Sequence, residues 1–179
     1  MSDATKNEAS WLQKAASTVP VYMSGESNRV ELIQEVTDGI RARLSTFPIT
    51  VVTQRPSAGP YMMIVFGGTM ASVGGRFGGA DMALDCGDDQ KSDLGWIAEG
   101  PQDPVLITNY AMGTIGFGLG LSATADPLDC MCGWENTCQQ DESGPCTLSA
   151  TIARDPSANE LCPGLTTQSE STMFDAFCH

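Results

Sequence analysis

The chain has 179 residues, of which 41% are hydrophobic and 17% charged. This length and composition suit one packed domain and exclude wholesale disorder, which requires a lower apolar content. Nine basic residues stand against 22 acidic ones, and the formal charge of −13 argues against a nucleic-acid-binding protein. The one histidine, His179, is the last residue, which excludes a histidine-rich metal site and an internal histidine base.

The charge is distributed unevenly along the chain. Residues 1–76 hold seven basic and six acidic side chains, whereas residues 77–179 hold two basic and 16 acidic ones. We interpret the second half as carrying a solvated acidic surface. Its aspartate-rich segment at 85–93 lacks the glycine and glutamate spacing of an EF-hand loop, so the pattern does not predict a calcium site.

The N-terminal part predicts a lead-in, a short strand and one long helix. Residues 1–19 are polar and are expected to form a flexible lead-in, and the apolar run at 19–23 is expected to form a first strand. Next, Asn28 is a candidate helix N-cap with Glu31 three residues on, and Pro48 marks the end of that helix. Apolar residues recur there at helical spacing: Val30, Ile33, Val36, Ile40 and Leu44.

Strands and loops are expected after this helix. Two β-branched or aromatic runs, at 49–53 and 61–66, are separated by a turn segment and predict paired strands. The glycine-rich run at 67–79 contains no lysine, so it predicts a mobile surface loop and not a phosphate-binding P-loop. Further short strands are expected at 83–84 and 94–98.

Residues 105–125 form a stretch without a charged side chain. Its length suits a membrane span, and Gly116 and Gly120 have the small-residue spacing of membrane helix dimers. However, its glycines and polar residues lower its apolarity, and basic flanking residues are missing. We therefore predict a helix buried inside a domain and not a membrane span.

The seven cysteines all lie in the second half of the chain: Cys86, Cys130, Cys132, Cys138, Cys146, Cys162 and Cys178. The tail beyond residue 126 is loop-like, with regular structure expected only at 148–153 and 172–177, so disulfides are its expected support. The odd number leaves one thiol free or paired between chains, and the connectivity stays open. A zinc knot on Cys130, Cys132 and Cys138 is the alternative, although the chain has no C-x-x-C pair.

Disulfides indicate an oxidising compartment, so an extracellular or cell-envelope location is expected. The first 20 residues contain no continuous apolar segment of a signal peptide. Either a signal has been removed from this chain or export follows another route. The expected organisation is a lead-in at 1–19, a sheet-and-helix subdomain at 20–125 and a cysteine-rich lobe of the same domain at 126–179.

Several segments, taken in order, resemble the metzincin zinc peptidases, specifically a bacterial matrixin-like group. They are R-P-S-x-G-P-Y at 55–61, the paired glycines after it, D-C-G-D at 85–88, the uncharged stretch and D-P-L-D-C-M at 126–131. The resemblance covers roughly residues 20–175. It implies a zincin-like α+β domain with a mixed twisted sheet, two main helices and a cysteine-rich C-terminal lobe.

The metzincin signature is H-E-x-x-H-x-x-G-x-x-H, followed by a turn that contains a methionine. Its three histidines bind zinc, its glutamate is the general base, and its glycine lets the chain leave the helix sharply. By this resemblance, the sequence keeps the glycine as Gly120 and the methionine as Met131. The histidine positions hold Gly113, Phe117 and Ala123, and the glutamate position holds Thr114.

These replacements remove the chemistry of the family. None of the four side chains can bind zinc or act as a base near neutral pH, so no catalytic residue, metal ligand or cofactor is expected. Zinc would need other ligands, such as Cys130 or Cys132, to fold into the cleft. The alternative to an ancestral site is that the glycines are close-packing positions and that Met131 fills a gap in a loop.

The resemblance implies a secreted, catalytically inactive metzincin-like domain that binds a peptide or protein in the former substrate cleft. In active relatives a substrate lies extended along an edge strand, and such β-augmentation needs no metal. Two alternatives stay open: an active peptidase with an unorthodox cysteine- or carboxylate-based metal site, and a disulfide-stapled structural or surface protein. The expected binding face comprises the 105–123 segment, Gly67 and a cleft edge of Tyr61, Met62, Met63, Ile64, Val65 and Phe66.

Overall fold

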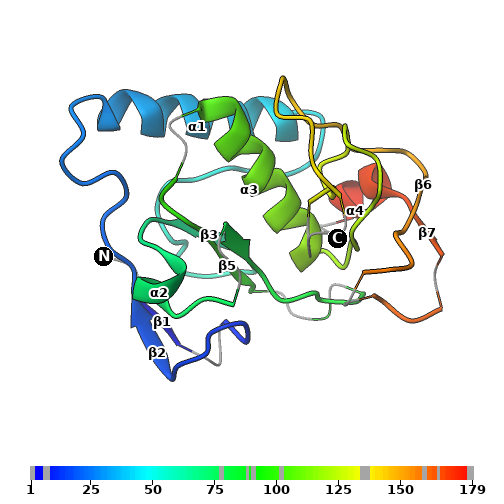
Figure 1. Cartoon of the computed structure of the whole chain (residues 1–179), viewed down its shortest axis with the longest axis horizontal. Helices are drawn as coiled ribbons and strands as arrows, with labels where there is room; N and C mark the ends of the chain where they lie inside the picture. The colour runs from blue at the N-terminus through cyan, green and yellow to red at the C-terminus, as the bar shows by residue number, and fades with distance from the viewer. Residues whose placement is uncertain are drawn as a thin grey trace.

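Two long helices, α1 (Arg29–Leu44) and α3 (Pro104–Gly118), lie over one face of a small mixed sheet in the computed structural model of the chain (Figure 1). The three-stranded sheet has the order β3 (Met63–Phe66), β5 (Leu94–Ile97), β4 (Ala80–Asp81). β3 and β5 are parallel, and β4 runs antiparallel to β5. The predicted α+β class with a mixed sheet and two main helices is therefore confirmed. The structure describes residues 3–5, 9–76, 79–87, 89, 92–100, 103–133, 138–158, 161–164 and 166–176.

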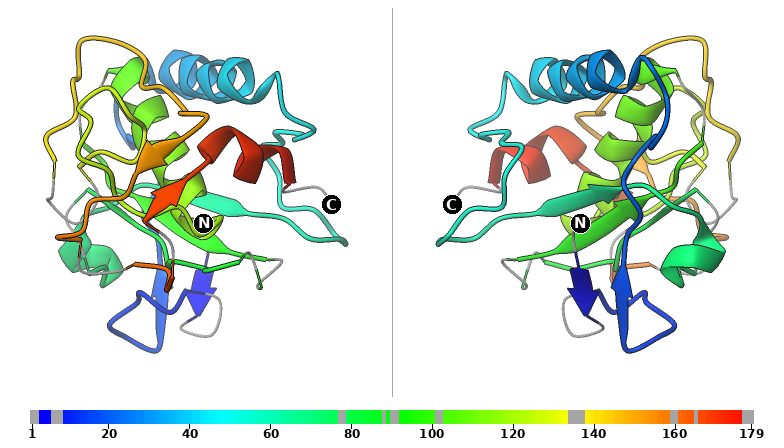
Figure 2. Two further views of the ribbon diagram at one scale, coloured as in Figure 1. Left: turned by 90° about the vertical axis from the view of Figure 1, so that its right-hand side faces the viewer. Right: turned by 90° about the vertical axis from the view of Figure 1, so that its left-hand side faces the viewer.

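Shorter elements flank this centre. The ribbon of β1 (Asp3–Thr5) and β2 (Ala16–Thr18) and the short α2 (Met70–Val73) lie on the side of the sheet opposite the long helices (Figure 1). The C-terminal segment wraps around the end of α3 (Figure 2). The regular structure expected there forms as β6 (Ile152–Ala153) and α4 (Glu170–Ala176), and β7 (Thr167–Gln168), which was not predicted, pairs with β6.

The predicted strands at 61–66 and 94–98 are confirmed in shorter form as β3 and β5. Three other predicted strands are wrong, since none of them is a strand in the described part of the chain: 19–23, 49–53 and 83–84. In the second of these, Ile49 and Val51 pack against the core while the residues that follow each of them are exposed. An extended segment thus satisfies the alternating apolar pattern without joining the sheet.

Both faces of β3 are covered, which divides the core into two layers. The side chains of Ile64 and Phe66 pack against the cluster that includes α1 and α3. Met63 packs with Val65 in a second cluster on the opposite face, because successive side chains of a strand alternate between its faces.

The N-terminal segment supplies part of this second cluster. Trp11 is only 2% exposed, and its ring stacks on Trp96 with the centroids 6.2 Å apart. Its Nε1–H donates to the carbonyl of Leu94 at 2.8 Å, which fixes the segment to β5. The prediction of a free lead-in is therefore wrong over residues 9–19, where a large buried aromatic side chain outweighs the polar composition.

The glycine-rich run at 67–79 is packed over its described first half and is not the expected mobile loop. Gly67 is buried, and its carbonyl accepts a hydrogen bond from Trp96 Nε1 at 2.7 Å. Thr69 and Ser72 then form reciprocal capping hydrogen bonds that start α2.

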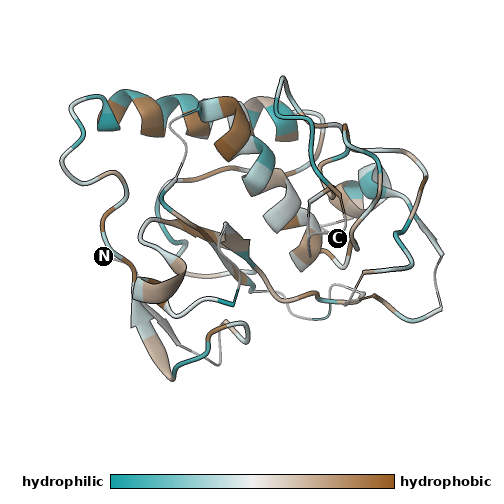
Figure 3. Ribbon diagram, viewed as in Figure 1, coloured by the Kyte–Doolittle hydropathy of each residue, from teal (hydrophilic) through white to brown (hydrophobic). Residues whose placement is uncertain are grey.

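The helix predicted within 105–125 is confirmed as α3, which is shorter than the uncharged stretch. It begins at Pro104, and the carboxylate of Asp103 caps it by accepting the N–H of Val105 at 2.8 Å. Buried residues lie on all sides of this helix, whereas those of the amphipathic α1 lie on one side. In Figure 3 the ribbon of α1 accordingly alternates between hydrophilic and hydrophobic residues. In the part of the chain that the structure describes, no helix is both long and apolar enough to cross a membrane.

The long amphipathic helix is confirmed as α1, but its cap and one member of its apolar stripe are wrong. The Asn28 side chain makes no capping hydrogen bond, and Val30 is 78% exposed. Leu32, and not Val30, belongs to the apolar stripe that faces the core, because Leu32 lies on the inward side of the helix. Its buried residues are Leu32, Val36, Ile40 and Leu44.

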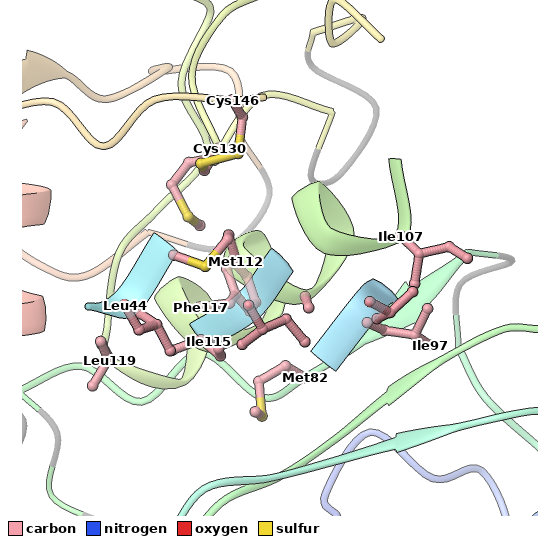
Figure 4. Close-up of a cluster of buried hydrophobic side chains, with 14 of the residues drawn as sticks. Leu44, Met82, Ile97, Ile107, Met112, Ile115, Phe117, Leu119, Cys130 and Cys146 are labelled. Carbon is pink, nitrogen blue, oxygen red and sulfur yellow. A yellow bond between two sulfur atoms is a disulfide. The ribbon is translucent and has the colours of Figure 1, made fainter. Parts of the chain in front are cut away.

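Six of the seven cysteines form disulfides, and Cys178 lies outside the described residues. This pairing confirms the disulfide-rich prediction and overturns the zinc knot, because a disulfide sulfur is not a thiolate ligand. It is also consistent with an oxidising location. The disulfide between Cys130 and Cys146 belongs to the main core cluster, together with Met112 and Phe117, and is drawn in Figure 4. The three pairs are Cys86–Cys162, Cys130–Cys146 and Cys132–Cys138.

Candidate functional site

The positions where the resemblance places the zinc ligands and the base lie inside the core. Gly113, Thr114 and Phe117 belong to α3, and Ala123 follows it. All four are buried, with Thr114 and Ala123 at 0% exposure. The Thr114 hydroxyl donates to the carbonyl of Tyr110 at 2.7 Å, so its polar group is used within the helix. No substrate can reach these side chains in this conformation.

Gly120 makes the sharp exit from the helix that the resemblance implies. Its φ of +81° lies in the left-handed region, and its N–H donates to the carbonyl of Phe117 at 3.0 Å. The N–H of Leu121 donates to the carbonyl of Gly116 at 2.9 Å, which completes a Schellman motif. A Cβ on Gly120 would lie 2.7 Å from the carbonyl oxygen of Asp85, so the close approach of that loop also requires glycine.

Met131 packs directly under the helix at this point. It is 0% exposed, and a Cβ on Gly116 would lie 2.5 Å from its Sδ. The methionine therefore fills the space below α3. This packing corrects the expected binding face: the 105–123 segment is buried almost throughout and offers no continuous surface to a peptide.

Zinc does not fit the residues present at these positions. Glycine, threonine, phenylalanine and alanine supply no imidazole, thiolate or carboxylate. The proposed substitutes, Cys130 and Cys132, are bonded to Cys146 and Cys138, which overturns the cysteine-based metal site. Among the described residues, no group of three or more histidine, cysteine, aspartate or glutamate side chains could hold a metal ion.

The predicted cleft edge, in contrast, includes an edge strand of the sheet. Among the strands that the structure describes, β3 pairs only with β5, and the N–H groups of Met63 and Gly67 donate to the carbonyls of Asp93 and Ile97. In a parallel ladder these alternate residues face the partner strand. The backbone N–H and C=O groups of the intervening alternate residues, Ile64 and Phe66, therefore point away from β5. This is the geometry that an added strand requires.

Arg55 lines two hollows, of which the smaller lies at the end of the sheet where β3 and β5 begin. The larger has a volume of about 480 Å³ and lies between Arg41 of α1 and residues 51–56. The smaller, of about 100 Å³, is lined by Tyr61, Met63 and the start of β5. Val52, in the larger hollow, is 55% exposed.

Arg55 is held in place between the two hollows. Its Nε–H donates to the Tyr61 hydroxyl at 2.6 Å, and its guanidinium lies 5.3 Å from the centre of that ring. Arg41, on the other wall, pairs with Asp38 at 3.1 Å, which offsets its charge. The hollows are therefore lined by both apolar surface and oriented polar groups, a combination common in ligand pockets.

Sequence reasoning identified Tyr61 and Met63 but missed the hollow at 51–56. The pattern there favours a strand, and the residues are exposed because the segment leaves the core before the turn. The one usable signal was the R-P-S-x-G-P-Y turn, whose arginine and tyrosine are the pair that contacts here.

Comparison with known proteins gives no relative. No family model matches the chain, and neither a curated protein nor a solved structure shows significant similarity to it. The metzincin resemblance therefore depends on the sequence segments themselves.

Proposed function

We propose that this chain is an exported, metzincin-like domain without zinc chemistry that binds an extended peptide or protein segment. The chemical part of this proposal is supported by the side chains at the former ligand positions, which cannot bind a metal and are packed in the core. Its disulfides support export, since such bonds persist in oxidising compartments.

The binding part is carried by one observation: the edge strand β3 begins at a hollow of about 100 Å³, and Arg55 lines both this hollow and the neighbouring one of about 480 Å³. A bound segment would pair its backbone with the outward groups of β3 and place a side chain against Val52 and Arg55. Because the former ligand positions of α3 are buried, this surface replaces the cleft expected over that helix. The rival function is a disulfide-stapled structural protein without a binding groove.

The first prediction concerns zinc. Chain purified after expression with added zinc should contain far less than one zinc per molecule and should not cleave an unstructured protein substrate. Elemental analysis and a chelator-sensitive peptidase assay measure both. One zinc per chain that persists after removal of His179 would overturn the inactive assignment.

The second prediction concerns the larger hollow. Linear peptides selected on the chain from a random phage-displayed library should bind Val52→Glu about tenfold or more weakly, since burying a valine contributes about 1.5–3 kcal/mol. Val30→Glu is the matched control, because Val30 is 78% exposed on α1 and does not line the hollow. Isothermal titration of synthetic peptides gives the affinities.

Each other outcome has a defined meaning. Equal loss in the two variants would indicate a general charge effect and contradict the hollow as the site. If the library yields no binder while the chain is folded and disulfide-bonded, the structural-protein alternative replaces the proposal.

A further inference from the structure

Two buried carboxyl groups, Asp129 and Glu170, join the C-terminal helix to the loop that follows α3. Both are 0% exposed. Asp129 lies two residues before Met131, and Glu170 is the first residue of α4. Their side chains are hydrogen-bonded to each other. Two carboxyl groups in hydrogen-bond contact inside a protein cannot both be ionised without a large electrostatic cost, unless a cation compensates their charges.

Glu170 is surrounded by fixed hydrogen-bond donors. Its Oε2 accepts the N–H of Ser149 at 2.8 Å, and its Oε1 accepts Nε2–H of Gln168 at 3.0 Å. The same amide of Gln168 also donates to the carbonyl of Ser122 at 2.9 Å. The Glu170 carboxyl group thereby connects α4 to Ser149 and Gln168, and Gln168 in turn connects to Ser122.

Asp129 is equally well held. Its Oδ1 accepts the N–H of Met131 at 2.8 Å and the hydroxyl of Thr124 at 3.2 Å. Its Oδ2 accepts the hydroxyl of Ser149 at 3.0 Å. Ser149 therefore donates to both carboxyl groups, from its N–H to Glu170 and from its hydroxyl to Asp129.

The nearby guanidinium of Arg154 does not neutralise the negative charge that an ionised Glu170 would carry. Arg154 donates from Nε to the Oε1 of Gln168 at 3.1 Å and from Nη1 to the carbonyl of Cys162 at 3.1 Å. Both of these acceptors are neutral oxygens, so the guanidinium acts on Glu170 only through the amide of Gln168. Among the described residues, the charged groups that face Glu170 are thus Asp129 directly and Arg154 through that amide.

We propose that Asp129 and Glu170 share one proton, and that this proton holds α4 against the domain and is lost as the solution becomes alkaline. Burial, followed by the charge of Asp129, raises the pKa of Glu170 to about 8. In an opened state Glu170 is solvated and has the ordinary pKa of about 4.3. The closed state therefore keeps a proton that the opened state releases between these two values.

The direction of the effect follows from this difference. Opening that releases one proton becomes more favourable as the pH rises, by up to about tenfold per pH unit. The increase stops above about pH 8, where the closed state has lost the proton too. The main cost of opening is withdrawal of Phe174, which is 0% exposed and packs on Phe47 with ring centroids 5.4 Å apart.

Amide hydrogen exchange on the whole disulfide-bonded chain tests this proposal. After correction for intrinsic exchange rates, the opening constant of α4 should increase several-fold to tenfold per pH unit between about pH 6 and pH 8, then level off. In Glu170→Gln, which keeps the shape but cannot ionise, it should be independent of pH. Asp175→Asn is the matched control, because Asp175 is an exposed acid of the same helix, and it should keep the wild-type slope.

Two results would overturn the proposal: a pH-independent α4 in the unmodified chain, or the same slope in Glu170→Gln. If that variant does not fold, infrared spectroscopy of the unmodified chain replaces it. A protonated carboxyl band at pH 6.5 that disappears by pH 9.5 is the expected result, and its absence at pH 6.5 is the contradicting one.

Discussion

At Gly120 the chain leaves α3 through a backbone conformation and a close contact that both require glycine. We expect Gly120→Ala to lower the free energy of unfolding by roughly 2–4 kcal/mol, since it adds a collision with the Asp85 carbonyl to the cost of a left-handed alanine. Gly25→Ala separates the two causes. Gly25 also has a positive φ, of +102°, but has no atom within 4 Å of its would-be Cβ. This variant should cost about 1 kcal/mol.

Urea unfolding followed by tryptophan fluorescence measures both variants. Equal losses of unfolding free energy in the two variants would show that backbone strain alone accounts for the effect of Gly120→Ala. The close approach of the 85–87 loop would then contribute nothing to it.

Single residues of the candidate site were predictable only where a local conformation depends on them. The turn at Gly120 could be anticipated because a helix exit of this kind needs a left-handed residue. The pairing of Asp129 with Glu170 could not, since the chain contains 22 acidic residues and nothing local distinguishes these two. Tertiary folding alone brings them together, and the same holds for Arg41 and Arg55 at the larger hollow.

At the scale of elements, the helices followed from their sequence patterns more closely than the strands. Long periodic or uncharged stretches predicted α1 and α3, because many residues contribute to each pattern. Their ends depended on particular contacts, such as the cap at Asp103. The four-residue strands β3 and β5 carry little pattern of their own, and an extended segment such as 49–53 has the same composition without pairing.

The proposed binding surface also belongs to this scale. Within the described residues β3 has no second strand partner, because neither 49–53 nor 19–23 forms a strand. An exposed edge is a liability for aggregation unless it is short or used for binding. β3 has four residues, so it satisfies the first condition, and the proposed peptide would satisfy the second.

At the scale of the whole molecule, covalent bonds join segments within the acidic half of the chain. Residues 77–179 carry 16 acidic side chains against two basic ones, and their mutual repulsion opposes a compact state. The disulfides lie in this half and close loops of different lengths. Their sequence separations are 76 residues for Cys86–Cys162, 16 for Cys130–Cys146 and 6 for Cys132–Cys138.

The last prediction ranks these disulfides by their loops. If a disulfide stabilises mainly by restricting the unfolded chain, replacing both cysteines by alanine should cost about 4.5 kcal/mol for Cys86–Cys162, about 3 for Cys130–Cys146 and about 2 for Cys132–Cys138. Alanine is preferred to serine, because Cys130 and Cys146 are buried and a hydroxyl there would need a partner. Urea unfolding of the three double variants under one buffer condition gives the order. A loss for Cys132–Cys138 as large as that for Cys86–Cys162 would contradict it. Local packing around the short loop would then stabilise the C-terminal lobe more than its long covalent link to the 85–87 loop beneath Gly120.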